Sequence, residues 1–207
     1  MRPVLTFCAL MVVVAGPVQV TKAFADAPFA PPTPLINADA VKPGPKTVAQ
    51  SFTLNGVKGT LEKTTFAEVQ KRFGGQVRRQ GDAGDSLAWL CYDLPAKHLR
   101  VWLSAGELHI QGGEIDEVSI WSAPSPANSA ECPVPAGPQS ASVSGLSPGQ
   151  AWTAAQAGLG VPGAAKGDWA AYAHTSRTGA LTEDDTLVVR IGDGRITHLQ
   201  ASRTTTN

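Results

Sequence analysis

The prolines of this 207-residue chain are concentrated in two windows, which limit where a packed core can form. Six of the 16 prolines lie between Pro28 and Pro45, and six more lie between Pro124 and Pro148. Because proline lacks an N–H donor and fixes φ, such stretches are unsuited to the interior of helices and sheets. The expected organisation is an extended Pro-rich tail at 26–46, a folded unit at 47–122, a Pro/Ser/Ala-rich linker at 123–139 and a second folded unit at 140–207.

The first 25 residues have the pattern of a secretory signal peptide. Arg2 supplies a positive charge, and an apolar run extends from Val4 to Gly16. This run is too short to cross a bilayer, which requires about 20 residues, but it suits the apolar core of a signal peptide. Ala23-Phe24-Ala25 has the small-x-small pattern of a cleavage site. We expect cleavage before Asp26, a periplasmic or secreted protein, and no stable membrane anchor.

Charge and cysteine content narrow the class of protein further. The chain has 17 basic and 17 acidic residues, whereas proteins that bind nucleic acid carry a surplus of Lys and Arg. A nucleic-acid partner is therefore not expected. Once the signal is removed, Cys91 and Cys132 remain. In an oxidising compartment such a pair more often forms a disulfide than two free thiols, and a catalytic Cys–His pair is the alternative.

The two expected units share features at a nearly constant spacing, which indicates an internal repeat. Both contain a capping box, at Thr65–Glu68 and at Ser147–Gln150, in which a hydroxyl precedes Glu or Gln by three positions. Both contain W-x-x-Y, and the four aromatic residues Trp89, Tyr92, Trp169 and Tyr172 are interpreted as packing residues. Five further matches lie 81 positions apart: Leu108, Ile110, Gly113, Ile115 and Val118 with Val189, Ile191, Gly194, Ile196 and Leu199.

Each unit is expected to contain one short helix. The capping box at Thr65 predicts the start of the first helix, and Gly74-Gly75 predicts its end. Ser147 predicts the start of the second helix, with Pro148 at its first position and its end near Gly158–Gly160.

The helices are expected to precede antiparallel strands joined by tight turns. Asp193-Gly194 is a strong two-residue hairpin signal, Gly112-Gly113 is expected to do the same in the first unit, and Asn55-Gly56 suggests a small hairpin. The three-residue spacing from Ile115 to Val118, repeated in the second unit, implies a bulge in each. The expected fold class is α+β: two tandem units, each a short helix packed on an antiparallel β-meander.

Two of these features carry a resemblance to a known fold family. They are the capped helix at Thr65–Gly74 and the motif L-x-I-x-x-G-x-I-x-x-V at Leu108–Val118, with its copy at Val189–Leu199. With them, the chain resembles the small outer-membrane assembly lipoproteins and the tandem-repeat β-lactamase inhibitor proteins. The resemblance implies a non-catalytic envelope or secreted protein that binds other proteins through its sheet face and loops. No lipid-attachment cysteine follows the expected signal, so membrane tethering is not implied for this chain.

One motif offers a catalytic alternative. Residues 145–149 satisfy G-x-S-x-G, the nucleophile elbow of α/β-hydrolases, and Asp184 or Asp185 and then His198 follow Ser147 in the right chain order. The elbow requires a buried strand immediately before the serine, whereas Ala141–Ser144 is short and polar. We therefore interpret Ser147 as a helix N-cap, and a small serine hydrolase remains the alternative. The four histidines lack metal-ligand spacing, so neither a metal nor a cofactor is expected.

The outward face of the expected sheet is the leading candidate for a binding site. If Leu99, Val101 and Leu103 point inward, Arg100 and Trp102 point outward, because side chains alternate along a strand. Trp and Arg are enriched at binding hot spots. The same alternation assigns the remaining candidates, and the full set is Arg100, Trp102, His109, Glu117, Trp121, Arg190 and His198.

The leading hypothesis is thus a non-catalytic, periplasmic or secreted module that binds another protein of the envelope or the extracellular space. Under an alternative interpretation, Trp102 and Trp121 are covered by the linker or by the other unit. A further alternative is a binder of a small molecule or an envelope polymer, with the tryptophans between the units as its binding residues.

Overall fold

The computed structural model describes residues 29–33, 36–37, 40–82, 86–122 and 131–207. Strands hold 48% of the residues and helices 12%, so the molecule is mostly β. The expected fold class, two α+β units each with a meander of its own, is therefore wrong. Strands from both expected units pair with each other in two antiparallel sheets, and local sequence patterns contain no information about such long-range pairing.

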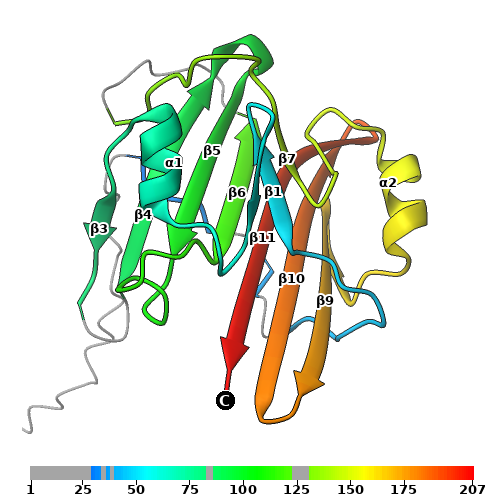
Figure 1. The fold of residues 1–207 in the computed structure, drawn as a ribbon. Helices are drawn as coiled ribbons and strands as arrows, with labels where there is room; N and C mark the ends of the chain where they lie inside the picture. Colours follow the sequence, from blue (N-terminus) through cyan, green and yellow to red (C-terminus); the bar gives the residue numbers. More distant parts are fainter. Residues whose placement is uncertain (1–28, 34–35, 38–39, 83–85, 123–130) are drawn as a thin grey trace, which may run out of the picture.

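The larger sheet has eight antiparallel strands. They are β3 (Arg78–Gln80), β4 (Leu87–Leu94), β5 (Leu99–Ala105), β6 (Glu117–Ser122), β8 (Ala164–Lys166), β9 (Trp169–Thr178), β10 (Leu181–Gly192) and β11 (Arg195–Thr206). A short 3-10 helix, η2 (Pro95–Lys97), joins β4 to β5. The strand order β3-β4-β5-β6-β11-β10-β9-β8 is symmetrical about the β6–β11 pair (Figure 1). The sheet therefore has a first half, β3–β6, and a second half, β8–β11.

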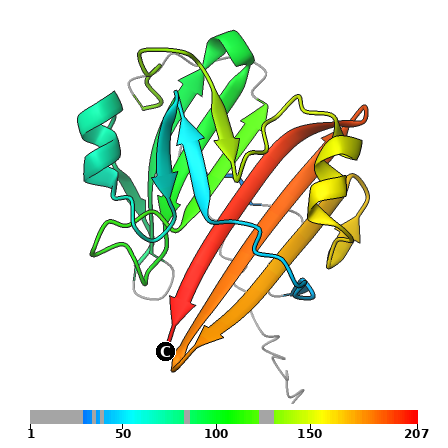
Figure 2. The same ribbon diagram turned by 45° about the vertical axis from the view of Figure 1, so that its right-hand side comes forward.

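One face of this sheet is covered by the remaining elements. They are β1 (Ser51–Leu54), β2 (Val57–Thr60), β7 (Ala141–Val143), α1 (Phe66–Phe73) and α2 (Trp152–Leu159). The three strands form a small sheet in the order β2-β1-β7. Figures 1 and 2 show this sheet between the two helices, in front of the larger sheet. We call the covered side the core face and the opposite side the outer face.

The main core lies between the two sheets and the helices. Phe66 and Val69 of α1 and Ala155 of α2 are buried in it, together with Phe52 and Leu54 of β1. The larger sheet contributes every second residue of its strands, as the two-residue period requires. Those residues include Leu90, Tyr92, Val101, Leu103, Val118, Ile120, Leu187, Val189, Leu199 and Ala201.

Both halves attach their helix to the sheet with the same hydrogen bonds. The first N–H of each helix donates to a turn glycine: Phe66 to the Gly113 carbonyl at 2.8 Å and Trp152 to the Gly194 carbonyl at 2.9 Å. The tyrosine of each W-x-x-Y motif donates its hydroxyl to the glycine that ends its helix. Tyr92 lies 2.7 Å from the Gly74 carbonyl and Tyr172 lies 3.5 Å from the Gly160 carbonyl.

The two helices test the same sequence signal with different results. The capping box at Thr65 is confirmed, since its hydroxyl accepts from the Glu68 N–H and Glu68 accepts from the Thr65 N–H. The start of the second helix at Ser147 was predicted wrongly, because α2 begins at Trp152 after Ala151. Gln150 does accept from the Ser147 N–H, but its own carbonyl accepts from the N–H of Ile196. A strand contact thus holds this segment out of the helix.

The turns also differ between the halves. The Asp193-Gly194 hairpin is confirmed, with φ of 50° and 70° in the left-handed region that a two-residue turn of this kind requires. A bulge lies beside it, where the register shifts between Arg190 and Ile191. The two-residue hairpin at Gly112-Gly113 was predicted wrongly, because a longer loop joins β5 to β6. Leu108, expected in a strand, lies in that loop with 69% of its surface exposed.

The predicted disulfide is confirmed between Cys91 and Cys132, whose Cα atoms are 4.6 Å apart. It attaches the segment around Cys132 to β4, as does a hydrogen bond from the Asp93 N–H to the Pro133 carbonyl. The expected signal peptide at 1–25 lies outside the described residues. Among the residues that are described, no helix is long and apolar enough to cross a membrane.

Candidate binding face of the eight-stranded sheet

Strand register places a row of cationic and aromatic side chains across the middle of the outer face. Arg100 lies opposite Trp121, Trp121 opposite His198, His198 opposite Arg190, and Arg190 opposite Trp169. Adjacent strands are about 4.8 Å apart, so neighbouring members of the row lie side by side on this face. We call these five residues the outer row.

The outer row is held together by ring contacts. The Trp121 and His198 rings meet edge to face with centroids 4.4 Å apart, and Trp121 lies 5.9 Å from Trp169. The Arg190 guanidinium lies 5.7 Å from the Trp169 ring and 2.7 Å from the carboxylate of Asp168. Burial, with a smaller effect of the Arg190 charge, lowers the pKa of His198 to about 4. The imidazole is therefore neutral at pH 7, and Arg100 and Arg190 carry the charge of the row.

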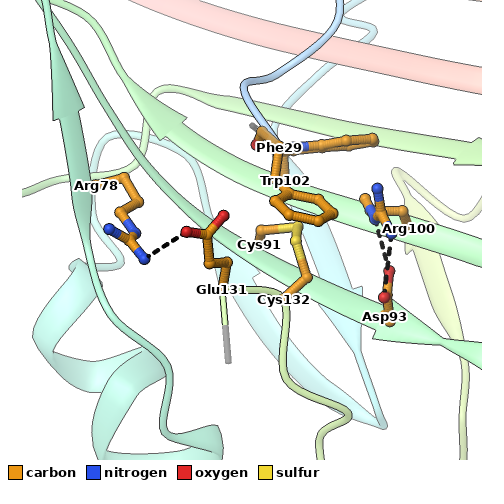
Figure 3. Close-up of a disulfide and its surroundings, with 8 residues drawn as sticks. All are labelled: Phe29, Arg78, Cys91, Asp93, Arg100, Trp102, Glu131 and Cys132. Carbon is orange, nitrogen blue, oxygen red and sulfur yellow. Dashed lines mark hydrogen bonds and ion pairs between the residues drawn. A yellow bond between two sulfur atoms is a disulfide. The ribbon is translucent and has the colours of Figure 1, made fainter. Parts of the chain in front are cut away.

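The N-terminal tail covers the end of the outer row that lies in the first half of the sheet, at Arg100. The Trp102 Nε1–H donates to the Phe29 carbonyl at 2.9 Å, and the Arg100 guanidinium lies 4.8 Å from the Phe29 ring centroid. Figure 3 shows the side chains of Phe29 and Trp102 next to each other beside the Cys91–Cys132 disulfide. We call Arg100, Trp102 and this disulfide the Phe29 socket.

A buried ion pair orients the arginine of the socket. Asp93 accepts from Arg100 Nε at 2.6 Å and from a terminal nitrogen at 3.2 Å, a two-point contact that fixes the plane of the guanidinium. The Asp93 side chain is 0% exposed and that of Arg100 is 14% exposed. On the other side of the disulfide, Arg78 pairs with Glu131 at 3.0 Å (Figure 3). The socket is therefore held by polar contacts on both sides.

The centre of the outer face is polar and sheltered. Glu117 accepts from Gln200 Nε2 at 2.7 Å and from the Ser104 hydroxyl at 3.2 Å. Burial, and less strongly the neighbouring Asp116 carboxylate, raise the pKa of Glu117 to about 7. Three buried atoms nearby have no hydrogen-bond partner among the described residues: Ser119 Oγ, Trp121 Nε1 and Gln200 Oε1.

A second stretch of the tail covers the second half. Ile36 and Val41 are buried against Trp169, Ala171 and Val188. The Gly44 N–H then donates to the carbonyl of Ala173 at 2.7 Å. The tail thus crosses much of the outer face, and the two tryptophan clusters of this face are packed against parts of the same chain.

The structure brings six of the seven predicted face residues to the outer face. Trp102 and His198 are only 7% and 8% exposed, while the Arg190 side chain is 42% exposed. The seventh, His109, was placed wrongly: it lies in the loop between β5 and β6, because Leu108–Ile110 is not a strand. Its ring contacts Glu62 at 3.3 Å and Asp116 at 3.2 Å.

The residues of the hydrolase alternative are not assembled into a triad. His198 lies opposite Arg190 and Asp184 lies opposite Thr204, six residues apart along β11, which corresponds to about 20 Å. Asp185 points to the other face and pairs with Arg203. The Nδ1 of His198 contacts the Thr197 hydroxyl at 2.9 Å rather than a carboxylate, whereas a general base needs an orienting partner within hydrogen-bond reach.

Trp169 packs as the sequence predicts, since it is 6% exposed and lies against Ile36 and Val41, and its register in β9 also places it in the outer row. Sequence reasoning missed one residue of the site. Phe29 was assigned to an extended tail without a role; it is the one aromatic residue of the expected tail 26–46, which is the signal that identifies it. Among the described residues, no group of His, Cys, Asp and Glu could hold a metal ion.

Comparison with known proteins adds no relative: no family model matches the chain, and no curated protein or solved structure matches it. The resemblance to the β-lactamase inhibitor and envelope lipoprotein fold family therefore stays a prediction.

Proposed function

We propose that the protein is a non-catalytic binding module of the periplasm or the extracellular space, and that it binds another protein on its outer face. The observation that carries the proposal is the outer row, Arg100–Trp121–His198–Arg190–Trp169, which spans five adjacent strands. Arginine and tryptophan in rigid, partly desolvated positions are the residues that dominate protein–protein binding energy.

Two further observations support this proposal. The Cys91–Cys132 disulfide is compatible with an oxidising compartment. The strands and the disulfide fix the side chains of the outer row before any partner arrives, which lowers the entropy cost of binding. Arg190 is the most useful member for a test, because its pair with Asp168 is exposed on both sides and its loss should disturb the fold little.

The test is affinity capture from envelope and secreted fractions, with the protein immobilised and the captured proteins identified by mass spectrometry. Arg190→Ala is compared with Arg79→Ala, which removes an equal charge from an exposed position on the edge strand β3. We expect Arg190→Ala to weaken capture of a specific partner at least ~10-fold, with no change for Arg79→Ala. Capture that is equal for both variants, or no specific partner, would refute the proposal.

A further inference from the structure

The Phe29 socket is a complete recognition site for an aromatic residue. Arg100 presents its guanidinium to the ring at 4.8 Å, and Trp102 donates a hydrogen bond of 2.9 Å to the carbonyl of the same residue. The Arg100 guanidinium also lies 5.9 Å from the Trp102 ring. The socket therefore binds two features of its occupant, an aromatic ring and the backbone carbonyl of the same residue.

The shape of the socket does not depend on Phe29. Asp93 holds Arg100 at two points from below, and Trp102 packs with Trp89 and the Cys91–Cys132 disulfide. Since β4, β5 and a covalent bond fix these groups, withdrawal of Phe29 leaves the ring-binding surface in place. A socket of this kind can accept a ring from another molecule with little rearrangement.

The tail is held less firmly than the socket. Pro31 and Pro32 have no N–H to donate, and among the described residues one hydrogen bond, from Trp102, ties residues 29–33 to the sheet. Phe29 adopts φ of 69°, a left-handed conformation that costs a residue with a side chain about 1–2 kcal/mol. Segments with few hydrogen bonds and local strain are the ones that open first.

We propose that Phe29 occupies the binding site of the partner in cis, and that the partner binds by placing an aromatic side chain of its own in the socket after the tail withdraws. This inference rests on the proposed function of the outer face. The occupant is a segment with an aromatic residue, and the carbonyl of that residue accepts from Trp102, as that of Phe29 does. Prolines that follow that residue are tolerated, as Pro31 and Pro32 are in the tail.

The tail then lowers the apparent affinity for the partner by the fraction of molecules in which the socket is open. Because the tail is tethered, its effective concentration at the socket is in the millimolar range, so only a matched partner displaces it. Removing the Phe29 ring opens the socket in every molecule. We expect this change to strengthen binding on the order of 10-fold.

The experiment uses the full chain and a fluorescent synthetic peptide with the sequence of residues 26–34, followed by anisotropy. Phe29→Ala is compared with wild type and with Thr33→Ala, an exposed tail position outside the socket. We expect the peptide to bind Phe29→Ala at least ~10-fold more tightly than either other chain. A peptide with Ala in place of Phe, or a Phe29→Ala/Arg100→Lys chain, should bind several-fold more weakly, because lysine lacks the flat guanidinium.

Equal binding of the peptide to wild type and Phe29→Ala, or no binding to either, would overturn the inference. So would a wild-type dimer in sedimentation that Phe29→Ala dissociates, because the occupant would then be the tail of a second copy. Partner capture separates the two proposals. Capture that depends on Arg190 but not on Phe29 leaves the proposed function standing without the cis competitor, whereas peptide binding without any captured partner leaves only the socket.

Discussion

The two halves of the eight-stranded sheet share a framework but differ in how their outer faces are covered. In the first half, a disulfide and the Phe29 contact close the face over Trp89 and Trp102. In the second half, Ile36 and Val41 pack on Trp169 without a covalent bond among the described residues. Figures 1 and 2 show that β9, β10 and β11 also extend past the small sheet, beyond the cover of the core face.

The comparison distinguishes the contacts that both halves share from the covers of the outer face, which differ between them. The hydrogen bonds that attach each helix to its turn glycine recur in both halves, so they belong to the common framework. The covers do not recur, and they lie on the face that carries the outer row. The outer face of the first half is therefore the more rigid one, and the outer face of the second half presents the more accessible charge, Arg190.

The largest expected difference between the halves is in their arginine–aspartate pairs. Arg100→Ala leaves the carboxylate of Asp93 buried without its partner, which should lower the free energy of unfolding by about 3–5 kcal/mol. Arg190→Ala breaks a pair whose members are 42% and 45% exposed, and the loss should stay below about 1 kcal/mol. Urea unfolding of both variants measures the difference.

A double variant, Arg100→Ala/Asp93→Ala, is the control for the first half. Removing both charges should recover part of the loss, because no unpaired buried carboxylate remains. Equal losses for the two single variants would show that the two arginines have equivalent structural roles, and the distinction between the more rigid and the more accessible half would fail.

The disulfide gives the next largest effect, and it is confined to the first half. The bond joins residues separated by 41 positions, and the chain-entropy estimate for such a loop is an upper value of about 4 kcal/mol. We expect Cys91→Ala/Cys132→Ala to lower the free energy of unfolding by about 2–4 kcal/mol. Amide hydrogen exchange should rise more in β4 and β5 than in β9 and β10; a uniform increase would contradict the assignment of this cover to the first half.

Lowering the pH should change the free energy of unfolding in opposite directions through two buried groups, one in each half of the sheet. Glu117 has a folded pKa of about 7, raised from 4.5, so it favours the folded state increasingly as pH falls from 7 toward 4.5. His198 has a folded pKa of about 4, lowered from 6.5, so its contribution is present above 6.5 and is lost as pH falls toward 4. In wild type the two contributions partly cancel.

Substitution of either group should make the pH dependence that the other group gives to the free energy of unfolding measurable between pH 7 and pH 5. In Glu117→Gln the free energy of unfolding should fall more steeply with acid than in wild type, by about 1–2 kcal/mol over this range. In His198→Asn it should fall less steeply or rise. Denaturant titrations at both pH values measure these slopes, and parallel slopes for all three chains would contradict the burial of these groups.

Local sequence signals predicted local structure, but they did not predict which distant strands pair. The Thr65 capping box and the Asp193-Gly194 turn involve neighbours in sequence, and both form as expected. The Ser147 box has the same pattern, a hydroxyl three positions before Glu or Gln, but the hydrogen bond between Ile196 and Gln150 overrides it. The β6–β11 pair and the β1–β7 pair join residues far apart in the chain, and alternation along single strands is compatible with many such pairings.

The candidate site shows the same limit. Alternation correctly predicted that Arg100 and Trp102 share a face, because this property belongs to one strand. It gave no sign that Phe29, 73 positions from Trp102, lies on that face. The contact between Phe29 and Trp102 depends on the path of the tail, which leaves the edge of the sheet at the hydrogen bond between Gly44 and Ala173. No periodic pattern in the sequence predicts that path.

The smallest expected effect compares the two helix-end tyrosines. The Tyr92 hydroxyl lies 2.7 Å from the Gly74 carbonyl, whereas Tyr172 lies 3.5 Å from the Gly160 carbonyl. Tyr92→Phe should therefore cost about 1 kcal/mol, the typical net value of one hydrogen bond, and Tyr172→Phe only a few tenths. Thermal unfolding of the two variants and of the double variant measures both losses. Because these hydrogen bonds belong to the common framework, equal losses would show that the halves attach their helices with equal strength, so that they differ in their covers alone.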